Sequence, residues 1–87
     1  MSISLPVKGK SIAVYPNPSH GTINFTSLEK VKTIEIYNAS GIMLKTFKVT
    51  NPQQLDYDIS NLSTGMYFIR LLKEDNQASY LKVELLK

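Results

Sequence analysis

The chain contains no cysteine among its 87 residues, which rules out a disulfide framework and a cysteine nucleophile. A chain of this length without disulfides can form only one small domain with one modest core. We therefore expect a single domain. The redox compartment stays open, because a protein without cysteine fits either an oxidising or a reducing one.

Long apolar runs are also missing. No stretch approaches the roughly 20 apolar residues that cross a bilayer. The start, residues 1–6, lacks the charged and apolar regions of a secretory signal. We therefore expect neither membrane insertion nor export of the chain as written. Two interpretations stay open: a cytoplasmic protein, or a piece from the end of a longer protein whose signal lies upstream.

Charge of one sign is scarce as well. The net charge is +3, and the ten basic residues are scattered from Lys8 to Lys87. Proteins that bind nucleic acid concentrate lysine and arginine in a patch or stripe that neutralises phosphates. The sequence therefore argues against a nucleic-acid partner.

Side chains that could carry out chemistry are few. The single histidine, His20, follows Ser19 in a proline-rich turn, which is a poor place for a positioned base. Asp56 and Asp58 lie two positions apart, and residues 74–76 gather oxygen atoms, but neither spacing matches a calcium-binding loop. Solvation and turn formation explain these residues. We predict no catalytic residue, no cofactor and no metal site, which makes an enzyme the weakest interpretation.

What the chain does have is the composition of a β protein. Hydrophobic residues make up 43% of it, with five tyrosines and three phenylalanines beside many isoleucines, valines and threonines. Such side chains pack well on a pleated surface. Proline, glycine and asparagine divide the chain into about seven short apolar segments, and no convincing helix is present. We predict an all-β fold with about seven antiparallel strands in a sandwich.

Alternation of apolar and polar residues places the expected strands and core. The segments are residues 12–15, 22–26, 31–37, 42–49, 54–59, 66–73 and 79–86. Side chains at every second position share one face of a strand. The expected core is Ile23, Phe25, Ile34, Ile36, Leu55, Tyr57, Ile59, Tyr67, Ile69, Leu71, Leu81, Val83 and Leu85.

Turn residues separate these segments. Residues 16–21 should form a rigid turn, because two prolines lack an N–H and Gly21 can take a positive φ. Residues 38–41 should close a hairpin, and Asp58 should accept a backbone hydrogen bond near Ser60 or Asn61. Two interpretations of the C-terminal strand stay open: an ordinary core hairpin with residues 66–73, or an open edge where another sheet could dock or a weak homodimer could form.

Four blocks of the sequence resemble the type A sorting domain of type IX secretion cargo. Residues 14–21, Val-Tyr-Pro-Asn-Pro-Ser-His-Gly, are similar to its opening signature, and residues 36–44, 58–69 and 80–87 are similar to its later blocks. The match holds in order and spacing over roughly residues 11–87. The motif residues carried over are Pro16, Asn17, Pro18, Gly21, Gly41, Asp58, Leu62, Gly65, Tyr67, Lys82, Val83 and Lys87.

This resemblance implies an immunoglobulin-like sandwich at residues 11–87, with residues 1–10 as a linker or expression remnant before it. It implies an address rather than a catalyst, attached to an upstream cargo that the Sec system delivers to the periplasm. The partners implied are an outer-membrane translocon, its shuttle protein and a sortase-like protease that removes the domain. The cargo is then expected at the cell surface or outside the cell, anchored or released.

Two other functions stay open. An accessory module that binds carbohydrate or protein could use outward tyrosines such as Tyr37 or Tyr80 as stacking platforms, because sandwich folds host many functions. It should show a coplanar row of exposed aromatic rings. A structural spacer between domains is the other alternative, against which the match at Lys87 counts.

Overall fold

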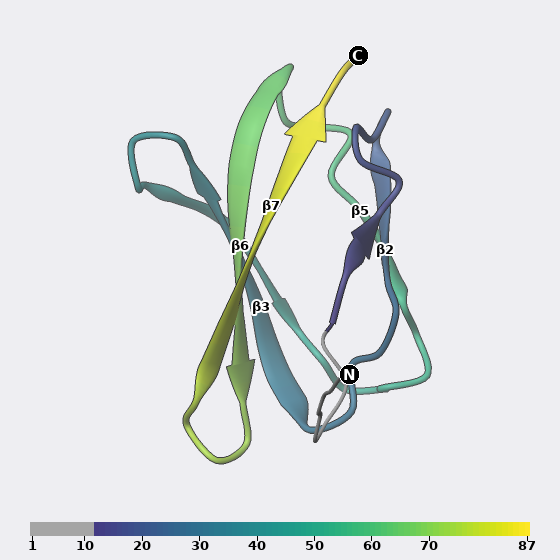
Figure 1. Cartoon of the computed structure of the whole chain (residues 1–87), viewed down its shortest axis with the longest axis vertical. Coiled ribbons are helices and arrows are strands. Elements are labelled where there is room, and N and C mark those ends of the chain that lie inside the picture. The colour runs from purple at the N-terminus through teal and green to yellow at the C-terminus, as the bar shows by residue number, and fades with distance from the viewer. Residues whose placement is uncertain (1–11) are drawn as a thin grey trace, which may run out of the picture.

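The computed structural model describes residues 12–87, which form two antiparallel β-sheets (Figure 1). The smaller sheet has the order β1-β2-β5 and the larger sheet the order β4-β3-β6-β7. The strands are β1 (Val14–Tyr15), β2 (Thr22–Phe25), β3 (Val31–Asn38), β4 (Met43–Lys48), β5 (Asp56–Asp58), β6 (Gly65–Lys73) and β7 (Ala78–Leu85). No helix occurs among the described residues. The predicted all-β sandwich of seven antiparallel strands is confirmed.

The strands of the smaller sheet are shorter than the sequence predicts. The segments expected at residues 12–15 and 54–59 shrink to two-residue β1 and three-residue β5. Backbone pairing nevertheless extends past their ends. The Thr26 amide donates to the Ala13 carbonyl at 3.0 Å, and the Phe25 amide donates to the Leu55 carbonyl at 2.9 Å. The predicted linker at residues 1–10 lies outside the described residues.

The core lies between the two sheets, where alternate side chains of both meet. The buried hydrophobic residues are Ile23, Phe25, Leu28, Val31, Ile34, Ile36, Tyr57, Ile59, Tyr67, Ile69, Leu71, Val83 and Leu85. The Tyr57 ring joins the sheets, because it packs edge-on against Phe25 and at a tilt against Phe47. Of the predicted core, Leu55 and Leu81 are only half-buried and pack at its margin.

The outer face of the larger sheet is polar at its centre. Glu35 on β3 and Arg70 on β6 are register partners, and their side chains form an ion pair at 2.7 Å. The Tyr37 hydroxyl also donates to the Glu35 carboxylate, at 2.9 Å.

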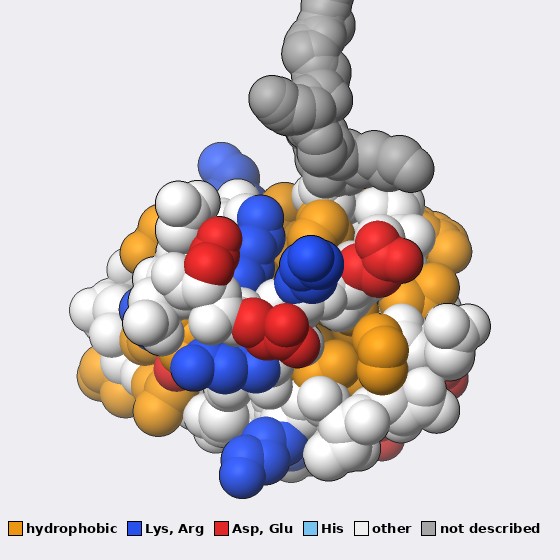
Figure 2. All heavy atoms as spheres, turned by 90° about the horizontal axis from the view of Figure 1, so that it is seen from below, with side chains coloured by type: hydrophobic (Ala, Val, Ile, Leu, Met, Phe, Trp, Pro, Cys, Tyr) orange, Lys and Arg blue, Asp and Glu red, His pale blue; other side chains and the backbone are white. Residues whose placement is uncertain are grey.

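Figure 2 shows the end of the molecule at the bottom of Figure 1, where basic and acidic side chains are interspersed around apolar ones. No single sign of charge dominates that end.

Candidate functional site

The turn at residues 16–21 docks on the outer edge of β7. The Asn17 side chain uses both ends of its amide: Nδ2 donates to the Lys82 carbonyl and Oδ1 accepts from the Glu84 amide, each at 3.0 Å. An asparagine amide can copy the donor and acceptor of a strand backbone in this way. Asn17 therefore acts as a short substitute for a neighbouring strand. Both proline peptide bonds that flank it, at Pro16 and Pro18, are cis.

Ser19 continues this pairing with its backbone. Its amide donates to the Glu84 carbonyl at 2.7 Å, and its carbonyl accepts from the Leu86 amide at 2.8 Å, which makes a parallel bridge to Leu85. The Ser19 hydroxyl is fully buried; it donates to the Thr22 carbonyl at 2.8 Å. Alternation could not reveal this burial, because a serine in a turn carries no strand periodicity. Ser19 is the buried polar residue that anchors the turn.

The same turn also contacts the segment that follows β5. The Gly21 carbonyl accepts from the Ile59 amide at 2.8 Å. A Cβ on Gly21 would lie 3.1 Å from the Ser60 Cβ, and the φ of Gly21 is +146°, so both space and backbone favour glycine here. Asp58 Oδ1 accepts from the Ser60 amide at 2.8 Å, as predicted. Its bonds to Ser60 lower the pKa of the Asp58 carboxyl.

The C-terminal residue ties the loop between β5 and β6 to this assembly. The Lys87 ammonium donates to the Ser60 carbonyl, and also to the Leu62 carbonyl at 3.2 Å. The Lys87 amide donates to the Thr64 hydroxyl at 3.0 Å. On the inner side of the loop, the largely buried Tyr67 donates its hydroxyl to the Ser63 carbonyl at 2.5 Å. The loop is thus held from both sides.

Three of the four sequence blocks therefore meet at one end of the sandwich, beside the C-terminus in Figure 1. We call this end the motif end; it comprises residues 16–21, 58–65 and 82–87. It brings together most of the predicted motif residues. The remaining block, residues 36–44, forms the hairpin between β3 and β4. This hairpin lies outside the motif end, with Gly41 exposed at its turn. Sequence reasoning missed Ser19, Ser60 and Glu84, which join the blocks.

The interpretation of the C-terminal strand as an open edge is wrong over residues 82–86. Asn17 and Ser19 occupy the outward backbone groups of Lys82, Glu84 and Leu86. A partner sheet cannot pair there without displacing the turn. The sequence could not show this, because the bonds join residues 65 and 67 positions apart.

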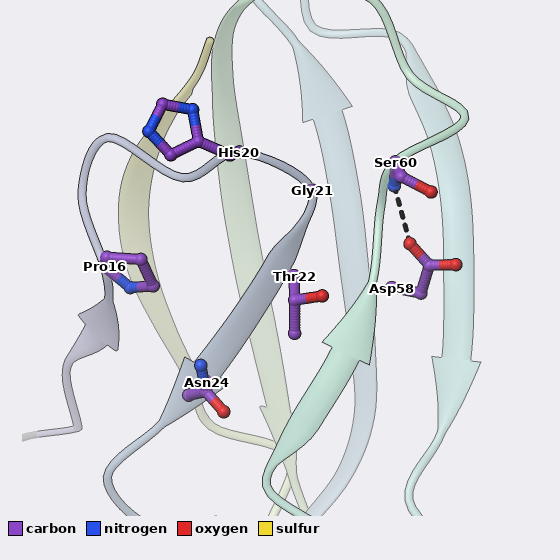
Figure 3. A pocket seen from close by; sticks show the side chains of 7 residues that line it. All are labelled: Pro16, His20, Gly21, Thr22, Asn24, Asp58 and Ser60. Atoms are coloured by element: carbon purple, nitrogen blue, oxygen red, sulfur yellow. Dashed lines mark hydrogen bonds between the residues drawn. The ribbon is translucent and has the colours of Figure 1, made fainter. Parts of the chain in front are cut away.

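An open hollow beside the turn carries no catalytic arrangement. It is lined by Pro16, His20, Gly21, Thr22, Asn24, Asp58 and Ser60. Figure 3 shows that the His20 ring points away from Asp58 and Ser60. His20 Nδ1 instead lies 2.8 Å from the Leu86 carbonyl oxygen. Across residues 12–87, no group of three or more metal-ligating side chains is found, and no helix is long and apolar enough to span a membrane.

Comparison with known families decides the assignment. The family model described as the secretion system C-terminal sorting domain matches residues 13–83. The chain belongs to this family. The match spans six of the seven strands completely and most of β7, so it includes the turn that docks on β7. No curated protein and no solved structure matches the chain.

Family membership gives the sorting domain its general role. It is a C-terminal sorting signal of type IX secretion, carried by a cargo that is bound for the cell surface or the extracellular space. Sorting domains of this family are signals and not catalysts.

Proposed function

We propose that this sorting domain is read as a folded address by the type IX outer-membrane translocon and its shuttle protein, and is then cut off by a sortase-like protease. Its upstream cargo reaches the periplasm first. The domain occupies residues 11–87, and residues 1–10 form the linker in which cleavage takes place. The cargo ends at the cell surface or outside the cell.

The observation that carries this proposal is the motif end. Residues 16–21, 58–65 and 82–87 are far apart in the sequence, yet a continuous set of hydrogen bonds joins them into one surface. A receptor that binds such a surface would read the folded domain, because the unfolded chain does not hold the blocks together. The motif residues within these three segments then have the role of building or displaying this surface.

The test is an export assay. Residues 1–87 are fused to the C-terminus of a fluorescent protein that carries a signal peptide, in a bacterium with type IX secretion. The full fusion should appear outside the cell, whereas a fusion ending at Asn76 should stay in the periplasm, because it lacks all of β7. If both fusions stay in the periplasm although the domain is folded, the proposal fails for that host.

A second pair of fusions separates a folded address from a linear one. Leu71→Ala removes a fully buried side chain of the core, far from the chain terminus, and leaves residues 72–87 intact. A folded address predicts that export falls in proportion to the unfolded fraction of this variant. Undiminished export of a variant shown to be unfolded would favour a linear signal. Met66→Ala, at an exposed position, is the control.

The rival binding module is not favoured. Tyr37 and Tyr80 lie on β3 and β7, and the Glu35–Arg70 ion pair occupies the sheet between those strands. The Tyr37 hydroxyl is also bonded to Glu35. The only paired aromatic rings found in residues 12–87 are those around Tyr57, in the core. The Tyr37 and Tyr80 rings are therefore not in contact with each other.

A further inference from the structure

The edges of the two sheets are protected to different degrees. Unpaired strand edges invite pairing with other chains, and proteins protect them by covering them or keeping them short. The second half of the β7 edge, from Lys82 on, is covered by Asn17 and Ser19. The edge strands of the smaller sheet, β1 and β5, have two and three residues. The remaining edge strand, β4, has six residues and pairs only with β3 within residues 12–87.

The pairing of β3 with β4 shows which backbone groups of β4 face outward. The Val49 amide donates to the Lys32 carbonyl at 3.0 Å, so the backbone groups of Val49 face β3. In an antiparallel pair, residues whose backbone groups face the partner alternate with residues whose backbone groups face away from it. The amides and carbonyls of Thr46 and Lys48 therefore face the open side. In the described part of the chain, no backbone hydrogen bond reaches them.

The start of this strand exposes apolar side chains. Ile42, Met43 and Leu44 are consecutive and are 59%, 50% and 42% exposed. They lie on the hairpin that projects at the upper left of Figure 1. A row of exposed apolar residues on an uncovered edge is a typical interaction site.

The charge of β4 selects the kind of partner. The strand carries Lys45 and Lys48 and no carboxylate, and the Lys45 ammonium lies 5.5 Å from the centre of the Phe47 ring. Pairing of β4 with a second copy of itself would bring four lysines into one ribbon, and like charges on paired strands are unfavourable. A strand with acidic residues would instead gain opposite-charge pairs with β4.

We infer that residues 42–48 form a docking edge for an extended segment of a partner protein in which apolar and acidic residues alternate. The segment binds by β-augmentation: its backbone pairs with Thr46 and Lys48, its apolar side chains lie over Met43 on one face, and its carboxylates lie on the other face beside Lys45. This inference goes beyond the proposed function and does not depend on it, since it concerns binding to the isolated domain.

The test uses a short synthetic peptide in which valine and glutamate alternate, and an otherwise identical peptide with lysine in place of glutamate. Both are titrated into the isotope-labelled chain and followed by NMR. The glutamate peptide should shift the amide signals of residues 42–48 and slow hydrogen exchange at Thr46 and Lys48. The lysine peptide should bind about tenfold or more weakly, because each opposite-charge pair becomes a like-charge pair.

Two variants check that binding occurs at this edge. Leu44→Glu adds a charge of the same sign as the glutamate peptide at an exposed position and should weaken its binding at least about fivefold. Tyr80→Glu makes a matched change on β7, at a position that is 71% exposed, and should leave binding unchanged. Thr46→Pro removes an outward amide at an edge position where proline is tolerated, and should abolish protection at β4.

Three results would overturn the inference: signal shifts outside residues 42–48, equal binding of the two peptides, or self-association of the chain through β4 at high concentration. None of them bears on the export assay. The failure of one proposal can therefore be told from the failure of the other.

Discussion

The Oδ1 atom of Asn17 lies 3.0 Å from the amide nitrogen of Glu84, a residue 67 positions later in the chain. With the second bond from Nδ2 to the Lys82 carbonyl, this one side chain occupies two outward backbone groups of the last strand. Asn17 thus links the start of the sorting domain to its end.

Asn17→Ala should therefore destabilise the domain by about 1–2 kcal/mol, the net value of two partly exposed hydrogen bonds. The midpoint of urea unfolding measures this loss. Asn61→Ala is the control, because no hydrogen bond of the Asn61 side chain is found within residues 12–87, and it should change the midpoint little. Equal effects of the two substitutions would contradict the role assigned to Asn17.

Gly21→Ala should destabilise the domain more than Gly41→Ala, by about 1 kcal/mol or more. Both glycines have a positive φ, +146° and +86°, but only a Cβ on Gly21 meets another residue, Ser60. Adding Ser60→Gly to Gly21→Ala removes the Ser60 Cβ that the new Ala side chain would contact, and should recover part of the lost stability. Thermal unfolding of the three variants checks this; no recovery would mean that backbone strain alone accounts for the cost.

Leu71→Ala should cost about 2–5 kcal/mol of unfolding free energy, and Val83→Ala somewhat less, because both side chains are fully buried between the sheets. A small domain has only about 5–15 kcal/mol in total, so the leucine variant should be partly unfolded at moderate temperature. Circular dichroism against urea concentration measures both. A midpoint equal to that of the unchanged chain would refute the core assignment.

The stability of the domain should fall in acid, partly through Glu35. The bond from Arg70 holds the pKa of the Glu35 carboxyl below its ordinary value of 4.5. A depressed folded-state pKa stabilises the fold above the unfolded-state pKa, and this contribution is lost as the pH falls through the lower folded-state value. Glu35→Gln should therefore flatten the dependence of stability on pH below about 4.5.

Urea midpoints at neutral pH and in acid, measured for Glu35→Gln and for Glu74→Gln, separate this contribution from general acid effects. Glu74 lies exposed in the turn after β6 and makes no ion pair within the described residues, so its substitution should keep the full pH dependence. Asp58, whose pKa is also lowered, supplies a residual dependence of the same sign in both variants.

Much of the fold was predictable because alternation along a strand reports burial directly. Ile34, Ile36 and Ile69 stand at every second position of long strands, and all three are fully buried. The burial of Leu28 was not predicted, because this residue lies in the loop between β2 and β3. Inward and outward side chains do not alternate in a loop, so burial there depends on the path of the chain.

The motif end was predictable only as separate turns. Proline and glycine in residues 16–21 indicate a rigid turn, but they do not indicate what the turn touches. Its contacts with β7 and with Ser60 depend on how the two sheets are placed, which local patterns do not encode. For the same reason an open edge of β7 stayed among the interpretations, and the edge of β4 was not singled out.

The docking of the first turn on the last strand also sets the order of assembly. Bonds that span 65 to 67 positions close very long loops, and chains dominated by such contacts fold slowly. A chain that emerges from a ribosome or a pore with its N-terminus first cannot finish this domain until residues 82–86 have come through. Until then the first turn stays undocked and the edge of the last strand has no cover.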